Sequence, residues 1–480
     1  MKRRRFLRTV LGSVLAAPVA CTRKSIRLSS SQGSHAKPNI VFVLADQWRA
    51  QALGHAGDPN VRTPNLDRLA VESVRFTHAV SGCPLCSPHR ASLMTGQYWL
   101  THGVFLNDVH LDPMACTMSQ ALGNGGHDTG YIGKWHLDGH GRTAFIPRER
   151  RHGFQFWRAA ECCHDYNNSF YYTDRDETLR WDGYDAIAQT REAQDYIRGH
   201  AGNRPFALFL GWGPPHDPYD TAPEEYRRRF DPEKIALRPN VPQAHYEQAR
   251  KDLAGYYAHI AALDDCIGSL VQTMEQAGIK DNTILVFTSD HGDMLHSQGR
   301  GKKRQPFEES IRVPFLIRFP RGFGNRGQEV DAPINTPDIM PTLLGLCGIG
   351  IPPGIEGKDF SVPLHQGRTP DIDAALLISV AASPGSSRQT GIPEYRGVRT
   401  RRHTYVRDLE GPWLLIDNET DPYQLDNLCC KPECAGLQQD LDGILARKLK
   451  ETHDEFRPGE EYLRAWNYKM DETGAVKRDS

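Results

Sequence analysis

Four apolar runs in the chain lack the alternation of polar and apolar residues that marks a half-exposed strand. They cover residues 39–45, 206–210, 283–287 and 313–317. A short continuous apolar run is typical of a parallel strand that is buried on both faces. Stretches that favour helix lie between these runs, at residues 65–72, 92–95, 188–197 and 243–277. This order predicts an α/β fold with a mostly parallel central sheet sandwiched by helices.

The pattern of the chain changes after about residue 365. The elements predicted beyond it are a Ser/Gly-rich loop at 385–391, short antiparallel strands at 399–406 and 413–417, and a helix at 437–452 with Leu437, Leu441, Ile444, Leu445 and Leu449 on one face. We therefore predict a large domain at residues 38–370, followed by a smaller C-terminal α+β domain at residues 371–480.

The first 21 residues are predicted to be an export signal. Residues 3–7, Arg-Arg-Arg-Phe-Leu, fit a twin-arginine signal, and the apolar stretch behind them is too short to span a membrane. Two outcomes stay open at its end, namely cleavage near Ala20 or lipid anchoring at Cys21. Residues 22–37 are polar and predicted to form a linker. We expect an exported protein in the periplasm or at the cell surface.

Composition excludes one class of partner. The net charge is −1 and the sequence pI is about 7.0, so no global field favours binding to nucleic acid. The 11 cysteines are permitted to form disulfides in an exported chain, but the sequence does not give their connectivity. The 20 histidines are more informative, because imidazole is a common metal ligand and proton carrier.

Polar side chains follow three of the predicted buried strands. Asp46 and Gln47 come after the first run, His216 after the second, and Asp290 and His291 after the third. Ligands of open α/β sheets bind at the carboxyl edge of the strands, so these groups are expected to meet there. Buried carboxylates that converge in this way require a cation. Oxygen ligands favour Ca²⁺ or Mg²⁺, while His291 leaves Mn²⁺ and Zn²⁺ as alternatives.

Further candidate groups lie in two basic segments. Lys134 and His136 are two residues apart, so on an extended segment their side chains point to the same side. Lysine supplies positive charge to an anionic group, and histidine exchanges protons near neutral pH. Lys302 and Lys303 precede the fourth buried run. A solvated surface is the ordinary alternative for such charges.

Cys86 is predicted to stand where a helix begins. Pro88 fits the first turn of a helix, so the free N–H groups there would stabilise a thiolate or another anion at Cys86. Arg90, one turn further on, can bind an oxyanion. A redox pair of Cys83 and Cys86 is the alternative, but nothing else in the chain is typical of a thioredoxin-like unit.

Together these segments resemble the formylglycine-dependent sulfatases, which have an alkaline-phosphatase-like fold. The residues that carry the resemblance are Cys86-Ser-Pro-His-Arg90-Ala-Ser-Leu-Met-Thr95-Gly96, Asp46-Gln47, Gly133-Lys134-Trp135-His136, Pro215-His216, Ser289-Asp290-His291-Gly292, Phe307-Glu308-Glu309-Ser310-Ile-Arg312-Val313-Pro314 and Asp421-Pro422-Tyr423-Gln424-Leu425. They stand in the order of the family and span residues 38–455. His89 departs from the family, which has a small residue there, and this puts the rate of Cys86 modification in question.

The resemblance implies a modified nucleophile. Cys86 would be oxidised to formylglycine (3-oxoalanine) by a formylglycine-generating enzyme in the cytoplasm, before export. One hydroxyl of the aldehyde hydrate would attack sulfur, and the second would then expel sulfate. Asp46, Gln47, Asp290, His291 and the modified Cys86 would hold a divalent metal, expected to be Ca²⁺.

The resemblance also implies a role for each remaining group. Arg90 would hold the formylglycine, while Lys134 and Lys303 would bind the sulfate oxygens. Lys303 is preferred to Lys302 because three residues separate it from Phe307, as in the family. The remaining expectations are that His216 or Lys303 protonates the leaving alcohol and that His136 accepts the proton that triggers sulfate release.

Three functions remain open. A sulfatase acting on a sulfated carbohydrate is favoured, because an exported enzyme meets polysaccharides. The others are a phosphonate or phosphate diester hydrolase on the same scaffold and a non-catalytic binder of sulfated glycans. Specificity is expected to depend on residues 138–185 and the C-terminal domain. The side chains that either bind the glycan there or serve packing and solvation are Trp157, Tyr166, Tyr171, Tyr172, Trp181 and the arginines at 399–402.

Overall fold

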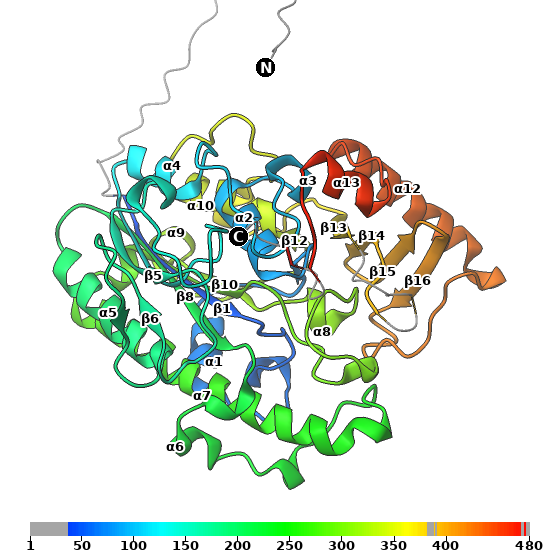
Figure 1. Cartoon of the computed structure of the whole chain (residues 1–480), viewed down its shortest axis with the longest axis horizontal. Helices are drawn as coiled ribbons and strands as arrows, with labels where there is room; N and C mark the ends of the chain where they lie inside the picture. Colours follow the sequence, from blue (N-terminus) through cyan, green and yellow to red (C-terminus); the bar gives the residue numbers. More distant parts are fainter. Residues whose placement is uncertain (1–36, 382–387, 389–390, 472–474, 477–480) are drawn as a thin grey trace, which may run out of the picture. The chain divides into compact units, whose positions relative to one another are not determined.

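A computed structural model describes residues 37–381, 388, 391–471 and 475–476 (Figure 1). Its centre is an 8-stranded sheet of order β11-β2-β10-β9-β1-β8-β4-β5. Strands β9, β1, β8, β4 and β5 run parallel, while β10 is antiparallel to both of its neighbours. The strands are β1 (Asn39–Asp46), β2 (Val74–Phe76), β4 (Asp128–Lys134), β5 (Phe156–Ala160), β8 (Phe206–Pro215), β9 (Thr283–Ser289), β10 (Phe315–Arg318) and β11 (Gln328–Val330). The predicted fold class is confirmed.

Helices cover both faces of this sheet, and β1 shows why its sequence is continuously apolar. Ile40 and Phe42 enter one apolar cluster, whereas Val41 and Val43 enter the cluster on the opposite face. The helices on the first face are α2 (Cys86–Thr95), α3 (Trp99–His102), α4 (Met118–Asn124) and α10 (Ile339–Leu346), and those on the second are α1 (Pro64–Val71), α5 (Asp185–His200) and α7 (Tyr246–Gln276). The two groups lie above and below the sheet in Figure 1.

A smaller antiparallel sheet follows in the C-terminal part. Its strands, in spatial order, are β13 (Ala374–Ser379), β14 (Tyr395–Thr400), β15 (His403–Asp408) and β16 (Gly411–Asp417). Val398, Tyr405 and Leu415 of this sheet share a cluster with Leu441 and Leu445 of α12 (Ala435–Glu451). The shorter elements are β3 (Ala79–Val80), β6 (Phe170–Tyr171), β7 (Leu179–Arg180), β12 (Ile334–Asn335), α6 (Glu224–Arg227), α8 (Glu308–Ile311), α9 (Pro320–Phe323), α11 (Ser361–His365) and α13 (Gly459–Ala465). The boundary at residue 370 stays a prediction.

Some predicted elements were wrong in detail. Residues 399–406, predicted as one strand, form the end of β14, a turn and the start of β15. The turn is favoured because the hydroxyl of Thr400 accepts hydrogen bonds from the N–H groups of Arg402 and His403, at 3.3 and 2.8 Å. Strand β4 was not predicted, because Asp128, Gly130 and Gly133 interrupt its apolar pattern.

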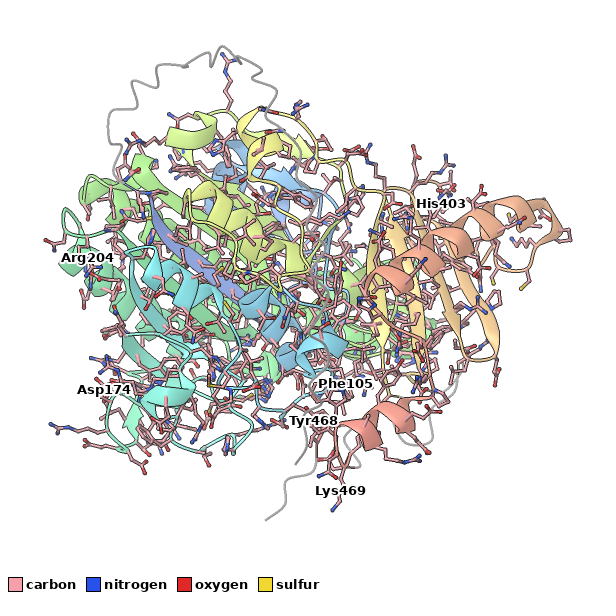
Figure 2. All side chains as sticks on the ribbon, turned by 90° about the horizontal axis from the view of Figure 1, so that it is seen from above. Phe105, Asp174, Arg204, His403, Tyr468 and Lys469 are labelled. Atoms are coloured by element: carbon pink, nitrogen blue, oxygen red, sulfur yellow. The ribbon has the colours of Figure 1, made fainter. Side chains whose placement is uncertain are left out.

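The last described residues of the chain pack against the loop that follows α3. Figure 2 shows Tyr468 beside Phe105, with ring centroids 5.4 Å apart. The hydroxyl of Tyr468 donates a hydrogen bond to the carbonyl of Gly103 at 3.2 Å. The N–H of Val476 donates to the carbonyl of Asn107 at 3.2 Å. The loop after α3 is therefore covered by the C-terminal segment.

Several predicted features lie outside the residues that the structure describes. Within those residues, disulfides and membrane-spanning helices can be checked. The export signal, Cys21 and most of the predicted linker and of the loop at 385–391 lie outside the described ranges. None of the ten cysteines that the structure describes forms a disulfide. Within the same ranges, no helix combines the length and apolar character needed to cross a bilayer.

A buried ion pair links the C-terminal antiparallel sheet to helix α8. Arg399 of β14 binds Glu308 of α8 at 2.8 Å, and both side chains are at most 5% exposed. Burial raises the pKa of Glu308, but Arg399 and Arg312 outweigh it and hold this pKa at about 2. Because the pKa is depressed in the folded state, the pair stabilises the fold above the ordinary glutamate pKa. This contribution disappears as the pH falls towards 2.

We expect Arg399→Gln to lower the free energy of unfolding by about 3 kcal/mol at pH 7, because Glu308 is left buried with one partner fewer. The deficit should shrink as the pH falls towards 2, because Glu308 without Arg399 becomes protonated in the folded variant at a higher pH than in the folded wild type, where its pKa is about 2. Urea unfolding at several pH values measures it. Arg407→Gln, which breaks the half-exposed pair with Asp442 in the same sheet, should cost much less. Equal, pH-independent deficits in both variants would contradict the prediction.

Candidate active site

Three neighbouring parallel strands deliver the candidate site residues to one edge of the sheet. Strand β1 lies between β8 and β9, with Asp46 opposite Pro215 and Ala45 opposite Ser289. The backbone N–H of Gln47 donates to Oδ1 of Asp290 at 3.1 Å, in a turn where Gln47 has a φ of 69°. The groups that follow these strands therefore meet as predicted, because all three strands end at the same level.

Cys86 begins helix α2, and its side chain is directed into this edge. The residue is 1% exposed. Its Sγ lies 3.2 Å from Nζ of Lys303, 3.3 Å from Nε2 of His291 and 3.8 Å from Oδ1 of Asp46. Burial and Asp46 raise the pKa of Cys86, but Lys134, Lys303 and His291 outweigh them and hold it well below its usual value. The site therefore stabilises negative charge on the group at position 86.

The neighbouring Cys83 has the opposite environment. It is 3% exposed, and burial raises the pKa of its thiol to about 12. Among the described residues its nearest cavity is a small one lined by Leu85, Phe105 and Ile378, which does not include Cys86. The two thiols therefore do not share a site, which disfavours the redox-pair alternative.

Four side chains form a candidate metal centre. One ligand atom each from Asp46, Cys86, Asp290 and His291 lies within 4.8 Å of the others, and all four residues are buried. Nδ1–H of His291 donates to the Gly292 carbonyl at 2.9 Å, which leaves the Nε2 lone pair directed at the group.

Two further observations test whether this donor set suits a cation. Oε1 of Gln47 is buried without a hydrogen-bond partner in the described part of the chain, whereas its Nε2 donates to Asp293 at 2.8 Å. Burial and the nearby Asp46 carboxylate raise the pKa of Asp290. An orphaned oxygen beside two crowded carboxylates fits a divalent cation, which would satisfy the oxygen and offset the repulsion.

Two buried cations hold the carboxylates in place. Nη2 of Arg90 donates to Asp290 at 3.1 Å and to Asp46 at 3.4 Å. Its Nη1 donates to the carbonyl of Lys134 at 2.8 Å, and Nζ of Lys134 donates to Oδ2 of Asp46 at 2.6 Å. Arg90 thus holds both carboxylates at the strand ends in place and also puts a positive charge close to position 86.

His136 reaches the site by a different route from the one expected. It was placed beside Lys134 on an extended segment, but it has a φ of 59°, outside the strand region. Its Nε2 lies 3.1 Å from Asp108, while its Nδ1 is buried without a partner in the described structure. Burial lowers the pKa of His136, but Cys162 and the hydrogen bond with Asp108 raise it to about 9. A buried, unpartnered nitrogen beside position 86 is suited to proton exchange.

His216 is fixed through both ring nitrogens. Nδ1–H donates to the Asp217 carbonyl at 2.8 Å, and Nε2 accepts from Nζ of Lys303, also at 2.8 Å. Burial and Lys303 together lower the pKa of His216 well below its usual value, against the effect of Asp46. A single hydrogen bond, from Lys303 to His216, therefore holds a transferable proton next to Cys86. The neighbouring Lys302 is 64% exposed and pairs with Asp217 instead.

A cavity of about 620 Å³ opens over Cys86. Its described lining consists of Leu85, Cys86, Asn107, Lys134, His136, Arg142, His164, His216, Asp217, Gly301, Lys302, Lys303, Arg304, Ile392 and Ala475. Arg142 and His164 lie within residues 138–185, where the sequence analysis expected specificity to reside, but it singled out neither of them, and it missed Asn107 altogether. No sequence signal marks them, because long loops bring them to the cavity. The ring of His164 stacks on that of His216, with centroids 4.4 Å apart.

His89, the departure from the family pattern, is a buried residue of helix α2. Its Nδ1 lies 3.2 Å from Oγ of Ser81 and 3.1 Å from Oγ1 of Thr336. It is absent from the described lining of the cavity. The fold accommodates the larger side chain in a polar niche, so it does not block access to Cys86. Its effect on Cys86 modification stays a prediction.

Comparisons with known proteins identify the family to which the chain belongs. The family model for sulfatases matches residues 38–349, and a model for the C-terminal part of N-sulphoglucosamine sulphohydrolase matches residues 298–452. The chain is 45% identical to an ulvan-active sulfatase of Formosa agariphila over 95% of this chain and 89% of the relative. It is 31% identical to an endo-4-O-sulfatase of Bacteroides thetaiotaomicron, over 92% of this chain and 97% of the relative.

Solved structures agree at the level of the fold. A structure from a study of glycosaminoglycan metabolism by Bacteroides thetaiotaomicron matches with a TM-score of 0.78 and 29% identity, covering 89% of this chain and 99% of the other. The phosphonate monoester hydrolase of Agrobacterium radiobacter matches with a TM-score of 0.69 and 24% identity, covering 92% of this chain and 100% of the other. The family match over most of the chain and the arrangement around Cys86 lead to one conclusion: this chain belongs to the sulfatase family and is a sulfatase.

Proposed function

We propose that this sulfatase removes sulfate from a sulfated carbohydrate and uses as nucleophile a formylglycine derived from Cys86. The observation that carries the proposal is the position of Cys86, which begins α2 and lies within 3.2 Å of Lys303 and 3.3 Å of His291. The names of two relatives, an ulvan-active sulfatase and an endo-4-O-sulfatase, support a saccharide substrate. Access through a cavity of about 620 Å³ suits a ligand larger than the sulfate group alone.

A cysteine rather than a serine at position 86 is explained by the need for two hydroxyl groups. The hydrated aldehyde of formylglycine carries both on one carbon. One would attack sulfur and displace the alcohol, which leaves a sulfate ester on the side chain. Loss of the proton from the other would then re-form the aldehyde and expel sulfate. Serine lacks the second hydroxyl and would stop after the first step.

Positive groups around position 86 would bind the reacting sulfate. Lys303 lies beside the Cys86 sulfur, and Lys134 is held on the adjoining carboxylate of Asp46. Their charges would stabilise the anionic sulfate oxygens as the bond to the alcohol breaks. A divalent cation bound by Asp46, Gln47, Asp290 and His291 would lower the pKa of the attacking hydroxyl and polarise the sulfate. We propose Ca²⁺, with Mg²⁺, Mn²⁺ and Zn²⁺ as alternatives.

Proton transfers would use the two histidines. His216 and Lys303 lie 2.8 Å apart, so the ammonium proton between them can be passed to the leaving alcohol. His136, whose Nδ1 has no partner in the described structure, would take the proton from the second hydroxyl when its ring is neutral. Because its pKa is raised to about 9, the neutral ring is the minor form at pH 7, and this step should become faster as the pH rises towards 9. Asp108 holds the other nitrogen of this ring and would keep it in position.

The proposed modification also fixes an order of events. A cytoplasmic formylglycine-generating enzyme would convert Cys86 before the folded chain is exported to the periplasm or the cell surface. Residues 1–21 would direct this export, and cleavage near Ala20 or lipidation at Cys21 would complete it. Burial of Cys86 at 1% exposure agrees with conversion before the fold closes.

Protein isolated from an exporting native host should carry an aldehyde at position 86, detected by peptide mass spectrometry and by reaction with a hydrazide probe. Cys86→Ala should lower turnover by a factor on the order of 10³ or more. Cys86→Ser should instead trap one sulfate per chain, visible in the intact mass. Cys83→Ala is the control and should keep its activity. An unmodified thiol in a chain that binds glycan without hydrolysing it would support the non-catalytic alternative.

Addition of Ca²⁺ to metal-stripped protein should raise the melting temperature, because an ion that binds the folded state at 100 times its Kd stabilises it by about 2.7 kcal/mol. Asp290→Asn should abolish the shift, and parallel titrations with Mg²⁺, Mn²⁺ and Zn²⁺ should rank the ions. Asp231→Asn, which changes a half-exposed carboxylate of a surface ion pair, should keep the full shift. The same shift in both variants would place the cation elsewhere.

Hydrolysis of an aryl sulfate should exceed hydrolysis of a phenyl phosphonate monoester in kcat/KM by about tenfold or more. Both substrates are tetrahedral monoanions, but the phosphonate carries a carbon substituent where the sulfate ester presents an oxygen to the lysines of the site. Both rates are measured with the same formylglycine-containing preparation. A preference for the phosphonate would favour the phosphonate or phosphate diester hydrolase instead. The likeness to the phosphonate monoester hydrolase shows a shared fold and does not decide between them.

A further inference from the structure

The cavity over Cys86 carries more positive charge than the reacting sulfate requires. Lys134 and Lys303 account for the cradle around position 86. Arg142 and Lys302 also line the cavity, and Asp217 is the single acidic residue in its described lining. We infer that Arg142 and Lys302 form a subsite for a second anionic group of the substrate. The inference rests on the proposed function and refines its substrate class.

Arg142 reaches the cavity from the loop after β4. Its side chain is 45% exposed, and its guanidinium binds Asp108 through Nε at 3.3 Å and Nη2 at 3.0 Å. Asp108 also contacts Nε2 of His136 at 3.1 Å. One carboxylate therefore positions both the candidate proton acceptor and the arginine. A guanidinium has five N–H donors, so this anchoring still leaves donors for a carboxylate or sulfate ester in the cavity.

Lys302 reaches the cavity from the loop that also carries Lys303. Its side chain is 64% exposed, and its Nζ lies 3.2 Å from Oδ2 of Asp217. Asp217 is shared as well, because its Oδ1 lies 3.2 Å from Nδ1 of His216 and accepts from Gln47 at 3.4 Å. Asp217 therefore offsets only part of the surrounding positive charge. Because several cationic side chains and one aspartate line the cavity in its described part, the field over the nucleophile is positive.

The aromatic residues and arginines that the sequence analysis named as candidate glycan-binding groups are absent from the described lining of this cavity. The described lining of the cavity holds no Trp, Tyr or Phe, and Trp157 and Tyr166 are at most 2% exposed in the apolar clusters. Among the arginines at 399–402, Arg399 is buried on Glu308, and Arg402 pairs with Asp417. Recognition next to the nucleophile therefore depends on charge and not on stacking of sugar rings.

These contacts define the substrate class as an acidic saccharide. It carries a second anionic group, either a carboxylate or another sulfate ester, on the sulfated sugar or on the sugar next to it. A neutral saccharide with one sulfate would make no ionic contact with the donors that Arg142 and Lys302 still offer beside Asp108 and Asp217, and would lose their contribution. Because each cation is only half-buried, we expect about tenfold for the pair in kcat/KM.

The test uses acidic oligosaccharides cut from a polysaccharide that the enzyme desulfates. In one arm the uronate carboxylates are reduced to primary alcohols, and in the other the non-reacting sulfate is removed. Wild-type kcat/KM should fall about tenfold in the arm that removes the recognised anion, which identifies it. An aryl sulfate, which has no second anion, serves as the reference substrate for every variant.

The variants are Arg142→Gln and Lys302→Gln, with Arg401→Gln as the matched control. Arg401 is also 50% exposed and paired with one aspartate, Asp331, but does not line the cavity. Lys302→Gln should reduce discrimination between native and modified oligosaccharides to about threefold or less, with aryl sulfate turnover within threefold of wild type. Arg142→Gln should also reduce discrimination, and Arg401→Gln should leave it unchanged.

Full discrimination in both cavity variants would overturn the subsite. So would an equal loss on oligosaccharide and aryl sulfate in both, since that indicates a general defect of the site. Equal wild-type rates on native and modified oligosaccharides would overturn it as well. None of these results removes sulfatase activity, whereas failure of the proposed function would appear as no hydrolysis of any sulfate ester by formylglycine-containing protein.

Discussion

The meeting of two carboxylates, Asp46 and Asp290, at the ends of adjacent buried strands is the constraint on which the rest of this site depends. Both side chains are fully buried, and charges taken out of water in this way are costly unless they are paired. Arg90 contacts both of them, and Lys134 contacts Asp46. Burial and Asp46 still raise the pKa of Asp290, so the arrangement remains electrostatically suited to an additional cation.

This constraint also explains why position 86 lies where it does. Helix α2 packs against the sheet through Leu93 and Met94, and its first turn lies over the strand ends. Arg90 on the same helix braces the carboxylates, so the brace and the nucleophile position are fixed by one element. A shift of this helix would separate Cys86 from Lys303 and disturb the carboxylates at the same time. Nucleophile, cation site and scaffold are thus mechanically coupled.

The cavity and the site beneath it are formed by different parts of the fold. The strand ends are rigid and fully buried, whereas Arg142, His164 and Lys302 come from loops at its rim. Loops attached to a rigid scaffold can change their side chains without disturbing the chemistry. The sulfate-handling groups are therefore held by the core of the fold, and the recognition of the remaining substrate is left to charged loop residues.

The sequence by itself determined the parallel sheet, the start of a helix at Cys86 and the convergence of Asp46, His216, Asp290 and His291. These features follow from local rules, because a strand buried on both faces reads as an apolar run and parallel strands end at one edge. The choice of Lys303 over Lys302 came instead from the resemblance to the sulfatases, and the structure places Nζ of Lys303 3.2 Å from the Cys86 sulfur.

Only the tertiary structure decided which other residues surround the nucleophile. Asp108, Arg142 and His164 belong to long loops whose paths depend on packing between distant segments, and no periodicity marks them. The buried pair of Arg399 with Glu308, two residues 91 positions apart in the chain, was fixed in the same way. The local sequence pattern indicates whether a side chain is buried. Which distant residue it contacts is decided only when the whole chain has packed.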